Sequence, residues 1–289
     1  MSNTQISAAG DRGKRTEPAA LLAVALEAAG QARDVIQQGR QQRQHLTIVH
    51  KKPNDLVSEI DRGAEEAIIR TLLAHFPDHS VIAEEGHDRT GSGPITWIID
   101  PLDGTTNFLH GLPHYAVSIA AAQKRPQDGQ LELVAGVVMD AAKDATFTAT
   151  RGGGAFLNGT PIRVSERSTI DQALVATGLP WPDSPHAEAF FAALRAIWRD
   201  CRNIRRPGAA SLDLAYVAAG ILDGYWETSL KLWDVAAGAL LVREAGGRIS
   251  DLAGGDTWLT TGHILAANPG VHQAMLDRIV VASNGHAFL

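Results

Sequence analysis

The feature that most constrains the fold is an apolar run that ends in two closely spaced carboxylates. Residues 97–99 read Trp-Ile-Ile, and Asp100, Pro101 and Asp103 follow directly. A short apolar run bounded by turn residues is typical of a buried strand. Because a proline has no N–H for strand pairing, we expect this strand to stop at Pro101. A chain with this segment must place two acidic groups at the end of a buried strand.

The residues after this pair predict a place for an anion beside the carboxylates. Gly104 lets a ligand approach the backbone closely, and Thr105 and Thr106 would begin a helix whose free N–H groups favour an anion. Asp100 and Asp103 would repel each other unless a cation lies between them. Mg²⁺ prefers oxygen ligands together with phosphate oxygens. The segment therefore favours a Mg²⁺ and phosphate site over the simpler alternative, a capped helix after a buried strand.

Composition limits the class of protein and of partner. The chain has 289 residues, of which 45% are hydrophobic and 20% charged, as in an average globular protein of one large or two small domains. A net charge of −6 argues against a nucleic acid as the main partner. The single cysteine, Cys201, excludes an intramolecular disulfide and favours a reducing compartment. The apolar stretch at 19–29 is too short to span a bilayer, so we expect a cytoplasmic protein without a membrane partner.

Hydrophobic periodicity predicts a chain of two halves. We expect residues 1–17 to form a flexible tail, 18–160 an N-terminal α+β half with most of the candidate metal ligands, and 161–289 a C-terminal α/β half. The expected helices cover residues 22–36, 61–75, 187–198, 211–219 and 234–245. The expected strands cover residues 81–83, 97–99, 115–122, 133–139 and 224–227, with a hairpin over 146–159.

Three further acidic positions stand where an expected element begins or ends. Asp61 and Asp234 each begin a helix, and Glu84 follows the strand at 81–83. Taken singly, each also fits an ordinary role, as a helix cap, a dipole partner or a solvated loop residue. Arg205 and Arg206 precede a glycine-containing loop and fit a substrate contact, a subunit interface or a solvated pair equally well.

In six ordered segments the sequence resembles the inositol monophosphatase family. These segments are residues 55–57 with Asp61, 83–86, 100–108, 153–159, 208–215 and 233–238. The resemblance implies an α/β fold of five alternating layers, αβαβα, as in the sugar-phosphatase and fructose-bisphosphatase superfamily. It also implies a Mg²⁺-dependent, lithium-sensitive phosphatase that acts on phosphomonoesters and forms a homodimer.

The resemblance also implies a set of metal ligands. Glu84, Asp100 and the backbone carbonyl of Leu102 would hold one Mg²⁺. Asp100, Asp103 and Asp234 would hold a second. Glu84 would also support a more weakly bound third ion, so that the site would take two or three ions in all and Glu84 would itself take part in catalysis.

The remaining site residues follow from the same resemblance. Asp61 would pair with Thr105 to orient the attacking water, and the N–H groups of Gly104 and Thr105 would hold the phosphate. Glu227 would contact hydroxyl groups of the alcohol. The loop that lines the same pocket consists of Gly208, Ala209 and Ala210.

These assignments predict hydrolysis of myo-inositol monophosphate to inositol and phosphate by a metal-activated water, with a small phosphorylated polyol as the partner. Histidinol phosphate and a nucleotide or sugar (bis)phosphate are the alternatives within the superfamily. A non-catalytic interaction module is a further alternative, which the presence of every matched carboxylate disfavours. The sequence departs from some members of the family at His50, Lys51 and Lys52, so the basic residue that faces the site stays open.

Overall fold

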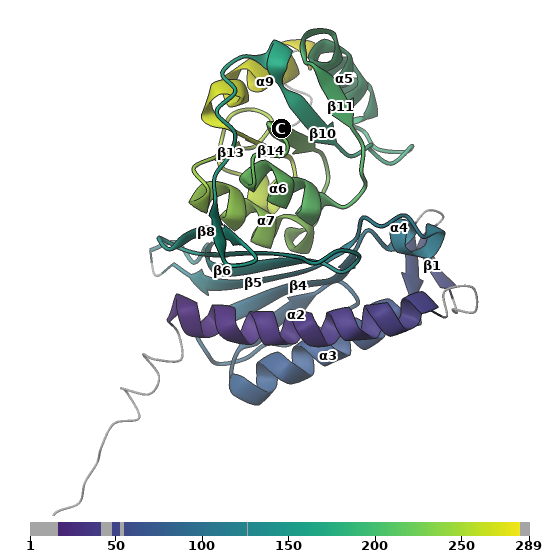
Figure 1. Cartoon of the computed structure of the whole chain (residues 1–289), viewed down its shortest axis with the longest axis vertical. Helices are drawn as coiled ribbons and strands as arrows, with labels where there is room; N and C mark the ends of the chain where they lie inside the picture. Colours follow the sequence, from purple (N-terminus) through teal and green to yellow (C-terminus); the bar gives the residue numbers. More distant parts are fainter. Residues whose placement is uncertain (1–16, 42–47, 53–54, 126, 284–289) are drawn as a thin grey trace, which may run out of the picture.

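The computed structural model describes residues 17–41, 48–52, 55–125 and 127–283, with side chains described outside 48–58. The five alternating layers implied by the resemblance are present, from the long helix α2 to the outer helices α5 and α9 (Figure 1). The expected tail at 1–17 lies, except for Glu17, outside the described residues. The side chains of His50, Lys51 and Lys52 lie outside them as well.

The first two layers are a helix pair and a seven-stranded sheet. Helices α2 (Pro18–Gln41) and α3 (Glu59–His75) pack against each other and on one face of the sheet. The strands lie in the order β3-β4-β5-β6-β7-β8-β9, antiparallel except for the parallel pair β3 and β4. Their bounds are Ser80–Ala83, Ile95–Asp103, Ala116–Lys124, Leu131–Asp140, Ala145–Thr150, Gly154–Leu157 and Thr160–Ile162. A two-stranded sheet of β1 (Ile48–Lys52) and β2 (Asp55–Ser58) precedes α3.

Strand β4 corrects the expectation that Pro101 ends the strand. The strand continues to Asp103, and its pairing with β5 shifts register between Asp100 and Asp103. Asp100 pairs with Ser118 and Asp103 with Ala116, so two residues of β4 stand against one of β5. Such a bulge accommodates a proline and re-aims the neighbouring side chains. The bulge thus lies between the two carboxylates.

The middle helix layer lies between the two large sheets. It consists of α6 (Ala210–Ala218) and α7 (Leu232–Glu244), which contact both the larger sheet and the smaller one. Every residue of α7 from Val235 to Val242 is buried, as expected for a helix covered on all sides. The short helix α4 (Thr105–His110) follows β4 directly.

The last two layers are a five-stranded sheet and an outer helix pair. The strands lie in the order β11-β10-β12-β14-β13, with β10 parallel to both β11 and β12. The bounds of β10 to β14 are Leu174–Thr177, Asn203–Arg205, Gly224–Glu227, Arg248–Ser250 and Ile264–Ala267. Helices α5 (Ala187–Asp200) and α9 (Pro269–Ala282) cover the outer face, and two short helical turns, η2 (Ile170–Gln172) and α8 (Trp258–Thr261), complete the half.

The core follows the layers. One cluster of buried apolar side chains joins α2 and α3 to the larger sheet, a second surrounds α6 and α7, and a third joins the smaller sheet to α5 and α9. In chain order, the last strand of the larger sheet ends at Ile162 and the first strand of the smaller sheet begins at Leu174. Among the described residues, no helix combines the length and the apolar character that a membrane span needs.

Candidate functional site

The segment after β4 brings together two residues that are distant in the sequence. The Thr105 hydroxyl donates a hydrogen bond of 2.9 Å to the Asp61 carboxylate, and it lies 3.1 Å from the Leu102 carbonyl. Gly104, which precedes helix α4, has φ 89°, a conformation that glycine adopts without strain. A Cβ atom there would lie 3.0 Å from the His114 carbonyl oxygen. The glycine thus allows the tight turn that presents Thr105 to Asp61 on α3.

Four predicted carboxylates from three separate parts of the chain lie close enough to affect one another. Burial raises the pKa of Asp100 well above its usual value, and the negative charges of Glu84, Asp103 and Asp234 raise it further. Burial, followed by the charge of Asp103, likewise raises the pKa of Asp234. A set of oxygen donors that oppose one another's ionisation fits a hard divalent cation.

Three of these carboxylates, those of Asp100, Asp103 and Asp234, already accept hydrogen bonds within the protein. The backbone N–H of Leu102 donates to Asp100 at 3.0 Å, and that of Lys231 donates to Asp234 at 2.7 Å. The Ser211 N–H and hydroxyl both contact Asp103 Oδ2, at 2.7 and 2.5 Å. Among the described residues, no three His, Cys, Asp or Glu side chains are gathered in the arrangement of a metal cage. The carboxylates are therefore neighbours that are held by the backbone at the ends of β4, α6 and α7.

The loop predicted to line the pocket is fixed to the same place. Asn107 of α4 donates hydrogen bonds to the carbonyl oxygens of Pro207, at 2.9 Å, and of His114, at 2.8 Å. Gly208 has φ 93°, and the buried Ala209 and Ala210 lead into α6. Asn107 thus fastens this loop to α4, and Ser211, just after the loop, contacts Asp103 directly.

Glu227, at the end of β12, lies in a buried acidic environment beside these groups. The Tyr225 hydroxyl donates a hydrogen bond to its carboxylate. A Cβ atom on Gly178 would lie 1.9 Å from Glu227 Oε1, so a side chain at residue 178 would displace the carboxylate. The pKa of Glu227 is raised to about 7, chiefly by burial; the charges of Asp213 and Asp103 also raise it, whereas the Tyr225 hydrogen bond and Arg206 lower it. The electrostatic effect of Asp103 connects Glu227 to the carboxylate group described above.

The structure also reveals residues that the sequence analysis did not single out. Glu65 is fully buried and accepts hydrogen bonds from the Glu85 N–H at 2.8 Å and the His87 N–H at 3.3 Å, and its carboxylate lies 2.6 Å from His87 Nδ1. It therefore anchors the turn that carries Glu84. A charged residue on the apolar face of α3, between the buried Ala64 and Ile68, was the available signal. Ser211 and Tyr225 carried no such signal.

Comparison with known proteins identifies the family. The model of the inositol monophosphatase family matches residues 17–284. The chain belongs to this family. The protein described as Nus factor SuhB from Pseudomonas aeruginosa is 45% identical over 264 residues, which cover 90% of this chain and 95% of the relative.

Solved structures of inositol monophosphatase relatives share the fold. The crystal structure of extragenic suppressor protein suhB from Bartonella henselae is 40% identical, with a TM-score of 0.85 over 90% of this chain and 98% of that one. The structure of inositol monophosphatase from Anabaena (Nostoc) is 33% identical, with a TM-score of 0.79 over 90% of this chain and 95% of that one. The predicted family and fold class are therefore confirmed.

Proposed function

We propose that the protein is a Mg²⁺-dependent phosphatase that hydrolyses myo-inositol monophosphate to inositol and phosphate. The observation that carries the proposal is the burial of Asp100 among Glu84, Asp103 and Asp234. Burying several carboxylates without a compensating cation costs free energy. Membership of the inositol monophosphatase family supports the same activity.

The proposal includes two or three Mg²⁺ ions, because buried carboxylate oxygens that oppose one another's ionisation suit a hard divalent cation. In this proposal Glu84, Asp100 and the Leu102 carbonyl hold one ion, and Asp100, Asp103 and Asp234 hold a second, with Glu84 also supporting a weaker third. When bound, Mg²⁺ ions supply positive charge to the phosphate oxygens and lower the pKa of a bound water. The carboxylates fix the positions at which that charge is available.

The chain's own groups orient the reactants. The Thr105 hydroxyl donates a hydrogen bond to Asp61, so in this scheme its oxygen accepts a hydrogen bond from the attacking water. The N–H groups of Gly104 and Thr105 bind the phosphate in this scheme. The Glu227 carboxylate, held by Tyr225, accepts a hydrogen bond from a hydroxyl of the alcohol, beside the loop of Gly208, Ala209 and Ala210. A polyol offers such hydroxyls, which favours inositol monophosphate as the substrate.

A panel of substrates tests the activity. Phosphate release is measured from myo-inositol monophosphate, histidinol phosphate, a 3′-phosphoadenosine 5′-phosphate type nucleotide and a sugar bisphosphate, with Mg²⁺ and with EDTA. We expect Mg²⁺-dependent release, fastest from myo-inositol monophosphate, and a loss of at least about a thousandfold in kcat/KM in Asp100→Asn and Asp234→Asn. Wild-type turnover in both variants would remove the metal assignment, and a faster rate on another substrate would replace inositol monophosphate. The same assay with Li⁺, and sedimentation of the protein, test lithium inhibition and the homodimer.

The names of the relatives favour a second candidate role, that of a Nus factor. Such a role would depend on a surface that binds a partner and would not require phosphatase activity. We would express wild-type protein and Asp100→Asn in a Pseudomonas aeruginosa strain that lacks its own SuhB. If both proteins restore the wild-type phenotype of that strain, the Nus role is supported. If neither protein restores it, the Nus role is removed. Restoration by the wild type alone would tie the phenotype to the phosphatase.

A further inference from the structure

A hollow lined by three arginines lies at the edge of the smaller sheet. Its volume is about 490 Å³, and Arg167, Arg202 and Arg205 contribute to its wall. Leu174 and Asn203, which begin the parallel strands β10 and β11, also line it, whereas Glu227 stands at the end of β12. None of the candidate site residues lines this hollow, so it is distinct from the carboxylate site.

The positive charge of the hollow exceeds the negative charge that offsets it. Arg167 pairs at 3.1 Å with Asp223, a fully buried carboxylate that also accepts hydrogen bonds from Ser165 and from the Leu174 N–H. Arg205 donates to the carbonyl oxygen of Ile204 at 3.0 Å.

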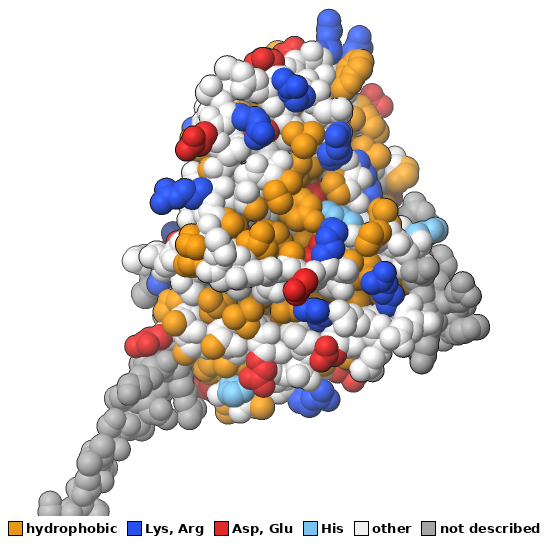
Figure 2. All heavy atoms as spheres, viewed as in Figure 1, with side chains coloured by type: hydrophobic (Ala, Val, Ile, Leu, Met, Phe, Trp, Pro, Cys, Tyr) orange, Lys and Arg blue, Asp and Glu red, His pale blue; other side chains and the backbone are white. Residues whose placement is uncertain are grey.

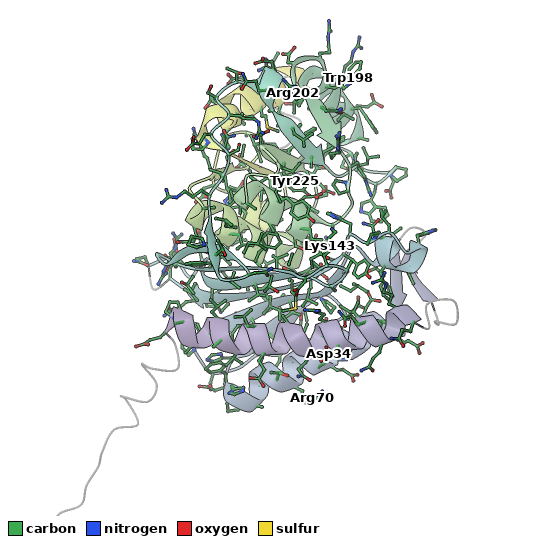
Figure 3. All side chains as sticks on the ribbon, in the orientation of Figure 1. Asp34, Arg70, Lys143, Trp198, Arg202 and Tyr225 are labelled. Atoms are coloured by element: carbon green, nitrogen blue, oxygen red, sulfur yellow. The ribbon has the colours of Figure 1, made fainter. Side chains whose placement is uncertain are left out.

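The guanidinium of Arg202 has no side-chain hydrogen bond or ion pair with any residue that the structure describes. No acidic side chain belongs to the wall itself. Figure 3 places Arg202 in the upper part of the C-terminal half, and Figure 2 shows separate Lys and Arg side chains at the surface of that half. Of these three guanidinium groups, only that of Arg167 is paired with a carboxylate among the described residues.

The remaining wall residues suit a small ligand with phosphate groups. A guanidinium group can bind two oxygens of one phosphate at once, through two parallel N–H donors. The side-chain amides of Gln172 and Asn203 can add further donors, and Leu174 and Ile221 supply an apolar part of the wall. The volume lies within the range of small-molecule sites. The net charge of −6 disfavours a long polyanion, which must contact a wider surface.

We propose that this hollow is a second anion site, which binds a small molecule with two or more linked phosphate groups. The bound anion offsets the mutual repulsion of the three arginines. The linked phosphates can reach Arg202 and Arg205 at the same time, whereas a single phosphate engages fewer donors. The proposal does not depend on the phosphatase activity, because it concerns binding alone.

Calorimetric titration of the full-length protein with inorganic tripolyphosphate tests the site. The buffer contains EDTA and low salt, so that the metal-free carboxylate site repels the anion. We expect one site per chain, weakened at least about tenfold in the double variant Arg202→Ala/Arg205→Ala. The matched control is Arg70→Ala on α3, an exposed arginine at the opposite end of the molecule (Figure 3), which should bind as the wild type does. Asp100→Asn should also bind normally.

Three results would overturn the proposal. The first is the absence of binding heat with wild-type protein at millimolar tripolyphosphate. The second is an equal affinity in wild type and in the folded double variant, or an equal loss in Arg70→Ala, which would show diffuse attraction. The third is equally tight binding of orthophosphate, which would remove the requirement for linked phosphates. Thermal unfolding of each variant verifies that it is folded.

Discussion

At the scale of single residues, the buried charge of Asp100 lowers the stability of the metal-free protein. The Asp100 side chain is 2% exposed and accepts a hydrogen bond from the Leu102 N–H. The charges of three other carboxylates oppose its ionisation. The free energy of unfolding of the metal-free chain must therefore include an unfavourable contribution from this residue at neutral pH, where an aspartate in the unfolded chain is ionised.

Asp100→Asn should raise the stability of the metal-free protein while it removes activity. The asparagine carbonyl can still accept the Leu102 N–H, and the repulsion is relieved. We expect a gain of about 1–2 kcal/mol at pH 7 in EDTA, which corresponds to about 2–6 °C in Tm for a chain of this size. Differential scanning calorimetry measures it. Asp34→Asn, at an exposed position of α2 (Figure 3), is the control and should change Tm little. A Tm below that of wild type for Asp100→Asn in EDTA would contradict the inferred repulsion between Asp100 and the neighbouring carboxylates.

The sequence predicted those site residues that lie in a motif. The segment 100–105 was recognisable because its carboxylates, glycine and threonines adjoin one another. The structure joins Thr105 to Asp61 by a hydrogen bond, and the roles assigned to these residues stay predictions. Glu65, Ser211 and Tyr225 could not be assigned in this way. Each acts on a partner through the fold, and Ser211 lies 108 residues from Asp103. A single polar residue has no local pattern that identifies such a partner.

At the scale of elements, α3 supports the site at two consecutive turns. Asp61 binds the Thr105 hydroxyl, and Glu65, four residues later on the same face, holds the turn that carries Glu84. Amphipathic helices such as α3 and α5 were predictable from the periodicity of their apolar residues. Strands of three or four residues, such as β11 and β13, are too short to show a period of two in the sequence. They form because they pair with the neighbouring strands β10 and β14.

Glu65→Gln should weaken metal binding at the carboxylate site. The amide NH₂ would face an N–H donor of the Glu85–His87 turn, which leaves the turn less well held. We expect the Mg²⁺ concentration for half-maximal activity to rise about tenfold, with a smaller change in kcat at saturating Mg²⁺. Titration with Mn²⁺, followed by electron paramagnetic resonance, gives the affinity without turnover. The neighbouring exposed residue supplies the matched variant, Glu66→Gln. An unchanged metal requirement in Glu65→Gln would show that the anchor is dispensable.

At the scale of the whole molecule, the two halves share the core cluster around α6 and α7. Helices α6 and α7 come from the C-terminal half, yet they pack on the larger sheet, which comes from the N-terminal half. Periodicity predicted both helices, but only the long-range packing determines that they lie between the two sheets. Global unfolding therefore also exposes the outer core, where the fully buried His272 of α9 contacts Ser250 at 3.1 Å.

His272 should contribute a loss of stability as the pH decreases from about 6.5 to about 4. Burial, and then the charge of Arg248, lower the pKa of His272 to about 4, whereas an unfolded histidine titrates near 6.5. The unfolded state thus binds the proton first, and His272 accounts for a loss of up to about 3 kcal/mol across this window. Urea unfolding at several pH values should show that wild type loses more stability toward low pH, or gains less, than His272→Gln does. His75→Gln, at an exposed histidine, should retain the wild-type slope, and an equal slope in all three would contradict the assignment.

The position of α6 and α7 has a consequence for synthesis of the chain. All seven strands of the larger sheet are translated before the first residue of α6, so a nascent chain carries a bare apolar sheet face while the ribosome completes the next fifty residues or so. Asp234 arrives later still, at the start of α7. A truncated product that stops near residue 160 would thus leave apolar surface exposed, where chaperones can bind it. It would also lack Asp234 and therefore the proposed phosphatase activity.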